Sequence, residues 1–215
     1  MNTIKGIIFD LDGTLLDTLE DLANSVNHVL NHFGLPTHPV ADYKMKVGSG
    51  IRKLIERALP EDKLELTDQG LEMQLDYYDK HCINTTKPYP GIIKLLEDLK
   101  AAGYKIGILT NKTDHLAQKI IKHYFDMDLF DIARGHLADV ALKPDPASVL
   151  GIAKQWNLAP SEIAFVGDSS VDMQTANNAK MKAIGVSWGF RSVEELKENG
   201  ADAIIDQADE LLKYV

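Results

Sequence analysis

The sequence is poor in cysteine, contains no long apolar run and carries no excess of basic residues. Cys82 is the only cysteine among the 215 residues, which excludes an internal disulfide. No stretch is long and apolar enough to cross a bilayer, and residues 1–5 lack the apolar run of a secretion signal. We therefore expect a cytoplasmic protein that does not have a membrane as a partner.

The charge balance bears on the molecules that the protein can bind. Acidic residues outnumber basic residues by 32 to 23, which gives a formal net charge of −9. A nucleic-acid backbone attracts the opposite balance, so nucleic acid is not expected as a partner. A small anionic molecule would need local cations, fixed or bound, to enter a site on this chain. The sequence leaves open whether the chain acts as a monomer or a homodimer.

Four apolar runs of strand length recur along the chain and are separated by helical patterns. A short apolar run that ends in polar residues or glycine is typical of a buried parallel strand. Alternating strands and helices predict an α/β fold with a doubly wound, mainly parallel sheet. The expected strands cover residues 6–11, 104–110, 163–167 and 183–188, with a shorter one at 203–205.

The stretch from Asp17 to Thr86 differs from the rest of the chain. Its apolar residues follow a helical period, and it contains no convincing strand. Asp17 and Glu20 have the spacing of a capping box at a helix start, and the proline- and glycine-containing segment 87–91 ends the helical pattern. We predict an α/β core domain of residues 1–16 and 87–215, interrupted by an all-helical cap domain of residues 17–86.

Two carboxylates stand at the end of the first expected strand. Asp10 and Asp12 are two residues apart, so they can point to the same side of an extended chain, and Gly13 allows the sharp turn that follows. Ligands of open α/β sheets bind beyond the carboxyl ends of the strands. Neighbouring carboxylates stay ionised together if they share a cation, and oxygen ligands favour magnesium. The competing interpretation is a turn that merely caps a helix.

A second pair of carboxylates follows the expected strand at residues 163–167. Asp168 stands directly after it, and Asp172 lies four residues further on, one turn along a helix that would start here. Asp168 would complete the metal site from the neighbouring strand, and Asp172 would hold a metal-bound water or orient a lysine. The competing interpretation makes Asp168 only an N-cap.

Thr110 and Asn111 follow the expected strand at residues 104–110. A threonine hydroxyl and backbone N–H groups at a helix start can hold phosphate oxygens, although both residue types are also common helix caps. We list both as candidate substrate-binding residues.

Lys143 and Pro144 precede another helical pattern. A proline restricts the backbone and so aims the lysine before it. Its ammonium group would balance both a carboxylate cluster and an incoming phosphate, whereas a solvated lysine is the competing interpretation.

Together, these four stretches resemble the four motifs of the haloacid dehalogenase superfamily, which consists mostly of phosphatases. The resemblance covers about residues 4–206, and the helical insertion is similar to the helical cap of that superfamily. Within it, the sequence is most similar to the phosphoglycolate phosphatases, on the segments 47–50, 88–91, 110–112 and 165–169.

The resemblance implies a Mg²⁺-dependent phosphatase that hydrolyses a small phosphorylated metabolite. Asp10 would attack phosphorus and form a phospho-aspartate, which water then hydrolyses. Asp12 would act as general acid and base through its side chain and would bind Mg²⁺ through its backbone carbonyl. Asp10 and Asp168 would be the carboxylate ligands of Mg²⁺, with Asp172 behind them. Lys143 would offset the negative charge of the site.

The cap is expected to choose the substrate and to close over it as a lid, because the four motifs all serve the phosphoryl group. In the segment 47–52, Gly48 and Gly50 let backbone N–H groups face a ligand, and a helix is expected to start at residue 51. With Ser49 and Arg52, these residues are candidate contacts for a second anionic group on the substrate. A tight turn with a solvated arginine is the competing interpretation.

Other functions of the same superfamily stay open at this point. A phosphomutase uses the same two aspartates and a helical cap, and release of inorganic phosphate would separate it from a phosphatase. A dehalogenase would need neither a metal nor the second aspartate, so Asp12 and Asp168 argue against it. A signalling receiver has no helical insertion, and a non-catalytic phosphate-binding protein would have lost one of the core groups.

Overall fold

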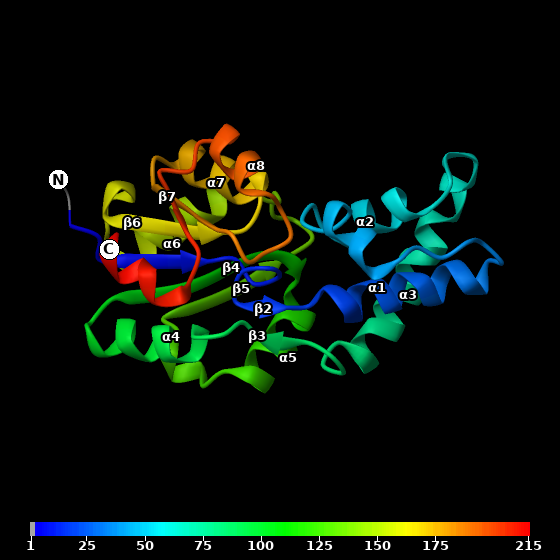
Figure 1. Ribbon diagram of the computed structural model, residues 1–215, viewed down its shortest axis with the longest axis horizontal. Helices are drawn as coiled ribbons and strands as arrows, with labels where there is room; N and C mark the ends of the chain where they lie inside the picture. Colours follow the sequence, from blue (N-terminus) through cyan, green and yellow to red (C-terminus); the bar gives the residue numbers. More distant parts are fainter. Residues whose placement is uncertain (1–2) are drawn as a thin grey trace.

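The computed structural model describes residues 3–215, which form an α/β core and a helical cap (Figure 1). The core holds a six-stranded sheet in the order β5-β4-β1-β6-β7-β8, and all neighbouring strands run parallel. The predicted α/β fold with an inserted helical cap is therefore confirmed. The strands of this sheet are β1 (Gly6–Phe9), β4 (Lys105–Thr113), β5 (Ile132–His136), β6 (Ile163–Gly167), β7 (Lys182–Val186) and β8 (Ala203–Ile205).

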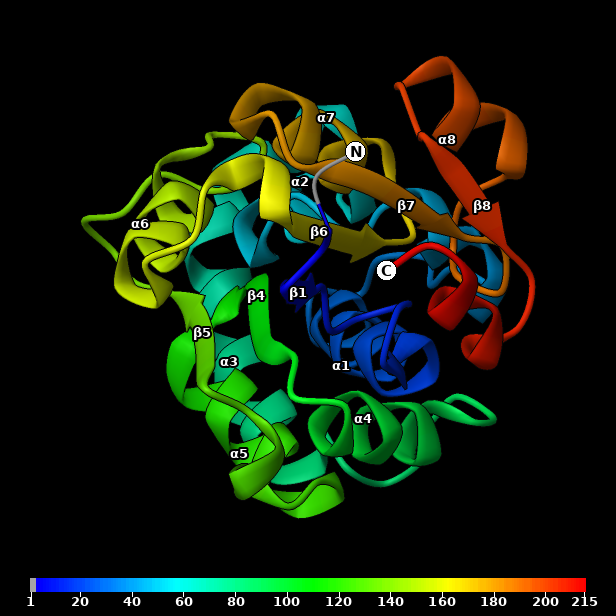
Figure 2. The ribbon, with the colours of Figure 1, turned by 90° about the vertical axis from the view of Figure 1, so that its left-hand side faces the viewer.

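The two faces of the sheet bury separate hydrophobic clusters. Side chains alternate across a strand, so Ile7 and Phe9 of β1 enter one cluster and Ile8 enters the other. Burial on both faces explains why this strand is a continuous apolar run. Two helices cover the first face and three cover the second (Figure 2), namely α4 (Ile92–Ala101) and α5 (Asp114–Tyr124), and then α6 (Ala147–Trp156), α7 (Ser170–Ala179) and α8 (Val193–Glu198).

The cap lies at one end of the molecule, beyond the carboxyl edge of the sheet (Figure 1). No strand lies between residues 18 and 86, a stretch that the structure describes in full. The cap contains α1 (Leu19–His32), α2 (Ile51–Ala58) and α3 (Thr67–His81), with the 3-10 helices η1 (Val40–Met45) and η2 (Glu61–Leu66). Three further 3-10 helices belong to the core, η3 (Met127–Leu129), η4 (Pro160–Glu162) and η5 (Ala208–Lys213).

The chain enters and leaves the cap through a small antiparallel ribbon. Its strands are β2 (Leu16–Asp17) and β3 (Lys87–Pro88), which pair with each other. The predicted domain boundaries, 16/17 and 86/87, fall at this ribbon, and the division into two domains stays a prediction. Residues 1 and 2, where the predicted core segment and the stretch without a secretion signal begin, lie outside the described residues. Within residues 3–215, none of the helices has the length and apolar character needed to span a membrane.

Two details of the sheet differ from the prediction. The edge strand β5 was not predicted, because its sequence Ile-Ala-Arg-Gly-His has no apolar run and its residues are mostly half-buried. β4 continues to Thr113 instead of ending near Thr110, with an irregular register against β5 beyond Leu109. The residues expected at a helix start therefore lie on an extended chain.

The predicted capping box of Asp17 and Glu20 is wrong. α1 begins at Leu19 with Thr18 as its N-cap, and Asp17 belongs to β2. The Thr18 hydroxyl makes no capping bond and instead donates to Asp12 at 2.7 Å. A residue with the chemistry of a helix cap thus serves the carboxylate of the preceding loop.

Candidate active site

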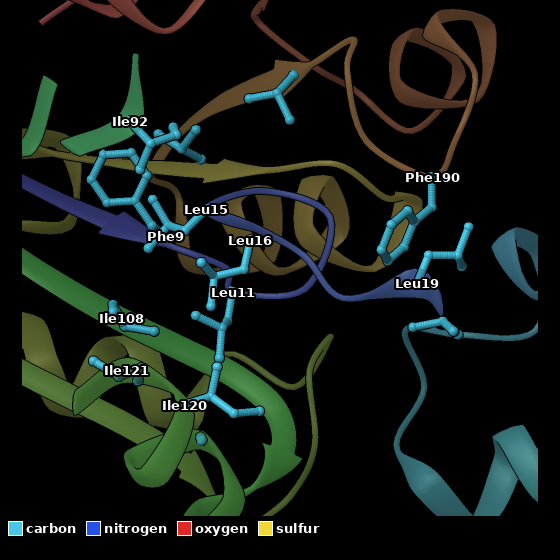
Figure 3. Packing of buried hydrophobic residues seen from close by; sticks show 14 of the residues in the cluster. Phe9, Leu11, Leu15, Leu16, Leu19, Ile92, Ile108, Ile120, Ile121 and Phe190 are labelled. Carbon is cyan, nitrogen blue, oxygen red and sulfur yellow. The ribbon is translucent and has the colours of Figure 1, made fainter. Parts of the chain in front are cut away.

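The loop after β1 carries Asp10 and Asp12 on a fixed support. The backbone N–H groups of residues 14, 15 and 16 donate to the carbonyl of residue 11 at 3.3, 3.0 and 3.0 Å. Buried leucines hold the loop against the sheet, because burying one leucine side chain contributes about 1.5–3 kcal/mol to stability. Three leucines of this loop are fully buried in the cluster of the first face (Figure 3): Leu11, Leu15 and Leu16.

Gly13 lets this loop pass close to Asp168. Its φ of +83° lies in the left-handed region, which favours glycine. A Cβ atom added at Gly13 would lie 2.3 Å from an Asp168 carboxylate oxygen, and one added at Gly189 would lie 2.2 Å from the Asp168 Cβ atom. The Asp168 side chain therefore occupies a slot that two glycines leave open.

Three carboxylates converge at the carboxyl edge of the sheet. Asp10 follows β1, Asp168 follows the neighbouring strand β6, and Asp172 projects from α7. One carboxylate oxygen of each lies within 4.8 Å of the others, and their residues are only 8%, 2% and 0% exposed. The parallel pairing of β1 and β6 accounts for the meeting of side chains that are far apart in the sequence.

Each of the two later carboxylates has fixed hydrogen-bond donors. Asp168 accepts from the backbone N–H of Phe190 at 2.8 Å and from the Thr14 hydroxyl at 3.4 Å. Asp172 accepts from the backbone N–H and the hydroxyl of Ser169 at 3.1 and 2.6 Å. Ser169, not Asp168, is the N-cap of α7, so the interpretation of Asp168 as only a helix cap does not hold.

Lys143 lies between two of the carboxylates and is itself buried. Its Nζ is 2.9 Å from Asp10 and 2.6 Å from Asp172, and it lies over the ring of Phe165. Burial lowers the pKa of Lys143, but Asp10 and Asp172 raise it by more, so it stays above its usual value and the amine stays charged. The interpretation of Lys143 as a solvated surface lysine is therefore wrong.

The cluster holds more negative charge than Lys143 alone balances. Burial, Asp172 and Asp12 raise the pKa of Asp10 from 3.8 to about 7, although Lys143 lowers it. Burial, Asp172 and Asp10 raise the pKa of Asp168 well above its usual value. An added cation would relieve this repulsion, and a set of carboxylate oxygens is the donor set that Mg²⁺ prefers. The residues present therefore fit a magnesium ion.

Asp12 is held by both the core and the root of the cap. It accepts from the Thr18 hydroxyl at 2.7 Å, and the Nζ of Lys112 lies 2.9 Å from each of its carboxylate oxygens. Lys112 also donates to the hydroxyl of Tyr78, at 3.2 Å, which comes from α3 of the cap. Burial raises the pKa of Tyr78 well above its usual value, so its hydroxyl stays neutral. Asp12 thus faces the same space as Asp10 but has a separate lysine.

Thr110 and Asn111 both reach the site, but they differ in what they can offer. Thr110 is buried and lines the pocket. The Asn111 side chain is already occupied, because its oxygen accepts from the backbone N–H of Lys143 and its nitrogen donates to the carbonyls of Gly48 and Lys143. The Asn111 side chain therefore links Lys143 to the cap loop, and because Asn111 also lines the pocket, substrate binding by it stays a prediction.

The cap loop contributes to the site in part. Gly48 and Gly50 line the pocket, whereas Ser49 and Arg52 do not. Among the described residues, the backbone N–H groups of residues 48–50 have no hydrogen-bond partner. Ser49 accepts from Arg57 at 3.0 Å, and the half-exposed Arg52 pairs with Asp68 at 2.5 Å on the surface. In this structure Arg52 lies outside the pocket lining, and its contact with a substrate stays a prediction.

The pocket between core and cap is small and has two kinds of lining. Its volume is about 50 Å³. Three carboxylates and one lysine line the core side, namely Asp10, Asp12, Asp168 and Lys112. Apolar residues line much of the remainder, namely Leu22, Val47, Ile51, Leu54, Leu116 and Phe190.

Five polar residues of this pocket were not predicted as site residues, namely Tyr78, Lys112, Thr113, Ser169 and Arg191. Lys112 had a usable signal, because it is two residues after Thr110 and an extended chain places both on one side. Tyr78 has the pattern of an ordinary buried helix residue. Arg191 lies in the loop after β7 and donates to the carbonyl of Val47 at 2.7 Å, a contact between core and cap that no local pattern predicts.

Comparisons with known proteins agree with this geometry. A family model described as haloacid dehalogenase-like hydrolase matches residues 7–186. The phosphoglycolate phosphatase of Psychrobacter arcticus is 33% identical over 97% of this chain and 94% of its own length. The phosphoglycolate phosphatase of Mannheimia succiniciproducens is 34% identical over 98% of each chain.

Solved structures show the same likeness over the whole chain. The crystal structure of a predicted phosphoglycolate phosphatase from Haemophilus somnus has a TM-score of 0.90 and 30% identity, covering 100% of this chain and 99% of its own. A haloacid dehalogenase-like family hydrolase from Streptococcus pneumoniae has a TM-score of 0.89 and 26% identity, covering 98% of each chain. Sequence and structure thus agree for both core and cap.

Proposed function

The chain belongs to the haloacid dehalogenase-like hydrolases and is a phosphatase, and we propose that it hydrolyses a small phosphate monoester through a phospho-aspartate on Asp10. The observation that carries this proposal is the buried cluster of Asp10, Asp168 and Asp172 around Lys143 at the carboxyl edge of the sheet. A carboxylate and a phosphate repel each other, so a carboxylate nucleophile needs fixed positive charge beside it. Lys143 supplies one such charge, 2.9 Å from Asp10.

The same cluster is proposed to hold Mg²⁺. Asp10 and Asp168 would bind it through their carboxylates and Asp12 through its backbone carbonyl, with Asp172 behind them. Magnesium usually keeps several waters, so two protein carboxylates suffice. When bound, the ion would supply charge that offsets the phosphate oxygens. That charge also answers how an acidic protein admits an anionic substrate.

Asp12 is proposed to move the proton in both halves of the reaction. In the first half, Asp10 attacks phosphorus and the bond from phosphorus to the leaving oxygen breaks, while Asp12 gives that oxygen a proton. In the second half, Asp12 takes a proton from the water that attacks the phospho-aspartate, so inorganic phosphate and the starting Asp10 are regenerated. Thr18 and Lys112 hold the Asp12 carboxylate in place for both steps.

The proposed substrate is a small phosphate ester with a second anionic group, and 2-phosphoglycolate is the leading candidate. Three observations support it: the small pocket, the unpaired backbone N–H groups of residues 48–50, and the names of the similar phosphatases. Gly48 and Gly50 line the pocket opposite the core motifs, where they would meet the leaving group. A cytoplasmic location and a monomer or homodimer stay predictions.

The test is phosphate release from a panel of esters, with Mg²⁺ or with excess chelator. The panel contains 2-phosphoglycolate, 2-hydroxyethyl phosphate and a hexose phosphate. 2-Hydroxyethyl phosphate is similar in size to 2-phosphoglycolate but has an uncharged hydroxyl in place of the carboxylate. We expect phosphate release to depend on Mg²⁺, and its rate per enzyme molecule to be highest with 2-phosphoglycolate. Full activity in chelator would contradict the metal assignment. Isomerisation of the hexose phosphate without net phosphate release would identify a mutase instead.

A further inference from the structure

The buried lysine on the leaving-group side of the pocket has so far been assigned only the role of holding Asp12. Lys112 projects from β4 into the pocket, and its side chain is only 5% exposed. Its ammonium contacts both carboxylate oxygens of Asp12 at 2.9 Å and the hydroxyl of Tyr78 at 3.2 Å. Burying a lysine is costly, so a position inside a ligand pocket calls for a reason beyond surface solvation.

The other cations in or beside the pocket already pair with other groups. Lys143 lies between Asp10 and Asp172. Arg191 donates to the carbonyl of Val47 at 2.7 Å and lies 3.4 Å from Glu195. Lys112 is therefore the cation of the described pocket lining that stands next to Asp12, the proposed proton donor to the leaving oxygen.

The proposed chemistry places the leaving group beside Lys112. A general acid must lie about 2.6–3.2 Å from the oxygen that it protonates, and Lys112 is 2.9 Å from that acid, Asp12. In an ester of the type phosphate–O–CH₂–COO⁻, the carboxylate is one carbon removed from the leaving oxygen. Such a carboxylate comes within reach of the Lys112 ammonium without any large movement of either group.

The cap completes this part of the pocket with a hydroxyl. Tyr78 belongs to α3, is 1% exposed, and directs its hydroxyl toward Lys112. A phenol that accepts a hydrogen bond from lysine still has its own hydrogen to donate. Lys112 from the core and Tyr78 from the cap thus present two donors to one place, and both are in position only when α3 lies against β4.

We propose that Lys112 and Tyr78 form the subsite that recognises the second anionic group of the substrate, a carboxylate one carbon removed from the phosphate ester oxygen. This inference rests on the proposed function and names residues that determine specificity. In this arrangement the substrate carboxylate shares the Lys112 ammonium with Asp12, and the Tyr78 hydroxyl donates to the carboxylate. The alternative is that Lys112 only positions Asp12. In that case, replacing Lys112 would affect substrates with and without a second charge equally.

The test compares kcat/KM for 2-phosphoglycolate with kcat/KM for 2-hydroxyethyl phosphate, which has a leaving group of similar size and no second charge. We expect Lys112→Met to lower the ratio of the two values about 10- to 100-fold, the worth of a hydrogen bond to a charged group. Tyr78→Phe should lower the same ratio by a smaller factor, about 3- to 10-fold. Lys112→Arg should retain much of the preference, and Lys122→Met, at an exposed position on α5, should leave it unchanged.

The outcomes separate this inference from the proposed function. A loss of activity in Lys112→Met that is equal for both substrates would show that Lys112 serves Asp12 alone and would overturn the subsite. An unchanged ratio in Tyr78→Phe would overturn the claim that the Tyr78 hydroxyl of the cap binds the substrate carboxylate. This variant also keeps the proposal testable if Lys112→Met does not fold. Wild-type protein that releases phosphate from neither ester would refute the proposed function together with the subsite, whereas the first two outcomes leave the phosphatase intact.

Discussion

The core and the cap meet at one pocket but build their shares of it in different ways. In the core, Asp10 and Asp168 leave from the ends of neighbouring parallel strands, and backbone donors and Lys143 hold them. In the cap, a glycine loop reaches the pocket and is held by core side chains, since Asn111 and Arg191 donate to the carbonyls of residues 48 and 47. The comparison indicates that the core holds Asp10 and Asp168 with its own groups, whereas the position of the cap loop depends on docking to the core.

The root of the cap shows how this docking is guided. The buried carboxylate of Asp21, in α1, accepts from four donors at 2.7–3.1 Å, namely the backbone N–H and hydroxyl groups of Thr85 and Thr86. The hydroxyl of Tyr124, in α5, donates to the carbonyl of Thr86 at 2.6 Å. These bonds join the two chain segments that connect core and cap, on the cap side of the ribbon. We propose that cap closure bends the chain at the ribbon of β2 and β3.

The largest effect is expected from the core nucleophile. Asp10→Asn should lower phosphate release from 2-phosphoglycolate by more than about 10⁴-fold, because an amide cannot form the acyl phosphate. The fold should remain, since an asparagine keeps the volume and can accept from Lys143. Steady-state assays with a sample checked for deamidation by mass spectrometry measure this. Appreciable turnover by the intact variant would mean that the core does not hold the nucleophile.

A smaller effect that depends on the leaving group is expected at Asp12. Positioned proton transfer contributes about 10²–10⁴-fold, so Asp12→Asn should lose about this much on alkyl phosphates. The loss should shrink for 4-nitrophenyl phosphate, whose leaving group needs no proton. Parallel kcat measurements on both esters decide this, and equal losses on both would refute the role of Asp12 as an acid.

A rise in pH should lower the free energy of unfolding, whereas added Mg²⁺ should raise it. Between the usual pKa of 3.8 and the folded value of about 7, the folded protein holds the Asp10 proton more tightly than the unfolded chain does. The free energy of unfolding in chelator should therefore fall as pH rises through this window. Mg²⁺ at neutral pH should raise it again, because the ion binds the folded state.

Urea denaturation at about pH 5 and about pH 7.5, with chelator or with Mg²⁺, measures both effects. Asp10→Asn should show a weaker decline with pH and a weaker response to Mg²⁺ than wild type. A decline of the same size in this variant would show that a group other than Asp10 causes the pH dependence of the free energy of unfolding.

The smallest effects are expected in the cap, where two arginines make a matched pair. Arg191→Met removes the core donor that holds the cap loop and should lower kcat/KM about 10-fold, the cost of one hydrogen bond to a charged group. Arg52→Ala removes an exposed pair with Asp68 and should change kcat/KM less than about twofold. A large loss in Arg52→Ala that affects only 2-phosphoglycolate would return Arg52 to the substrate site.

The two regions also differ in what the sequence could predict. Asp10, Asp168 and Lys143 were identifiable because short motifs stand at strand ends, and the parallel sheet brings such ends together. The orientation of Arg52 was not, because it depends on how α2 is rotated against the core. Tyr78 has no motif of its own and becomes part of the site only through the docking of α3 against β4.

Trapping the covalent intermediate tests the central claim most directly. The enzyme is mixed with 2-phosphoglycolate and Mg²⁺, quenched in acid within the first turnovers, reduced with borohydride and digested for mass spectrometry. Borohydride reduces an acyl phosphate to an alcohol, so the account predicts homoserine at position 10, formed in step with the first release of glycolate. Reduction at another carboxylate, or a full first turnover with position 10 unmodified, would contradict it.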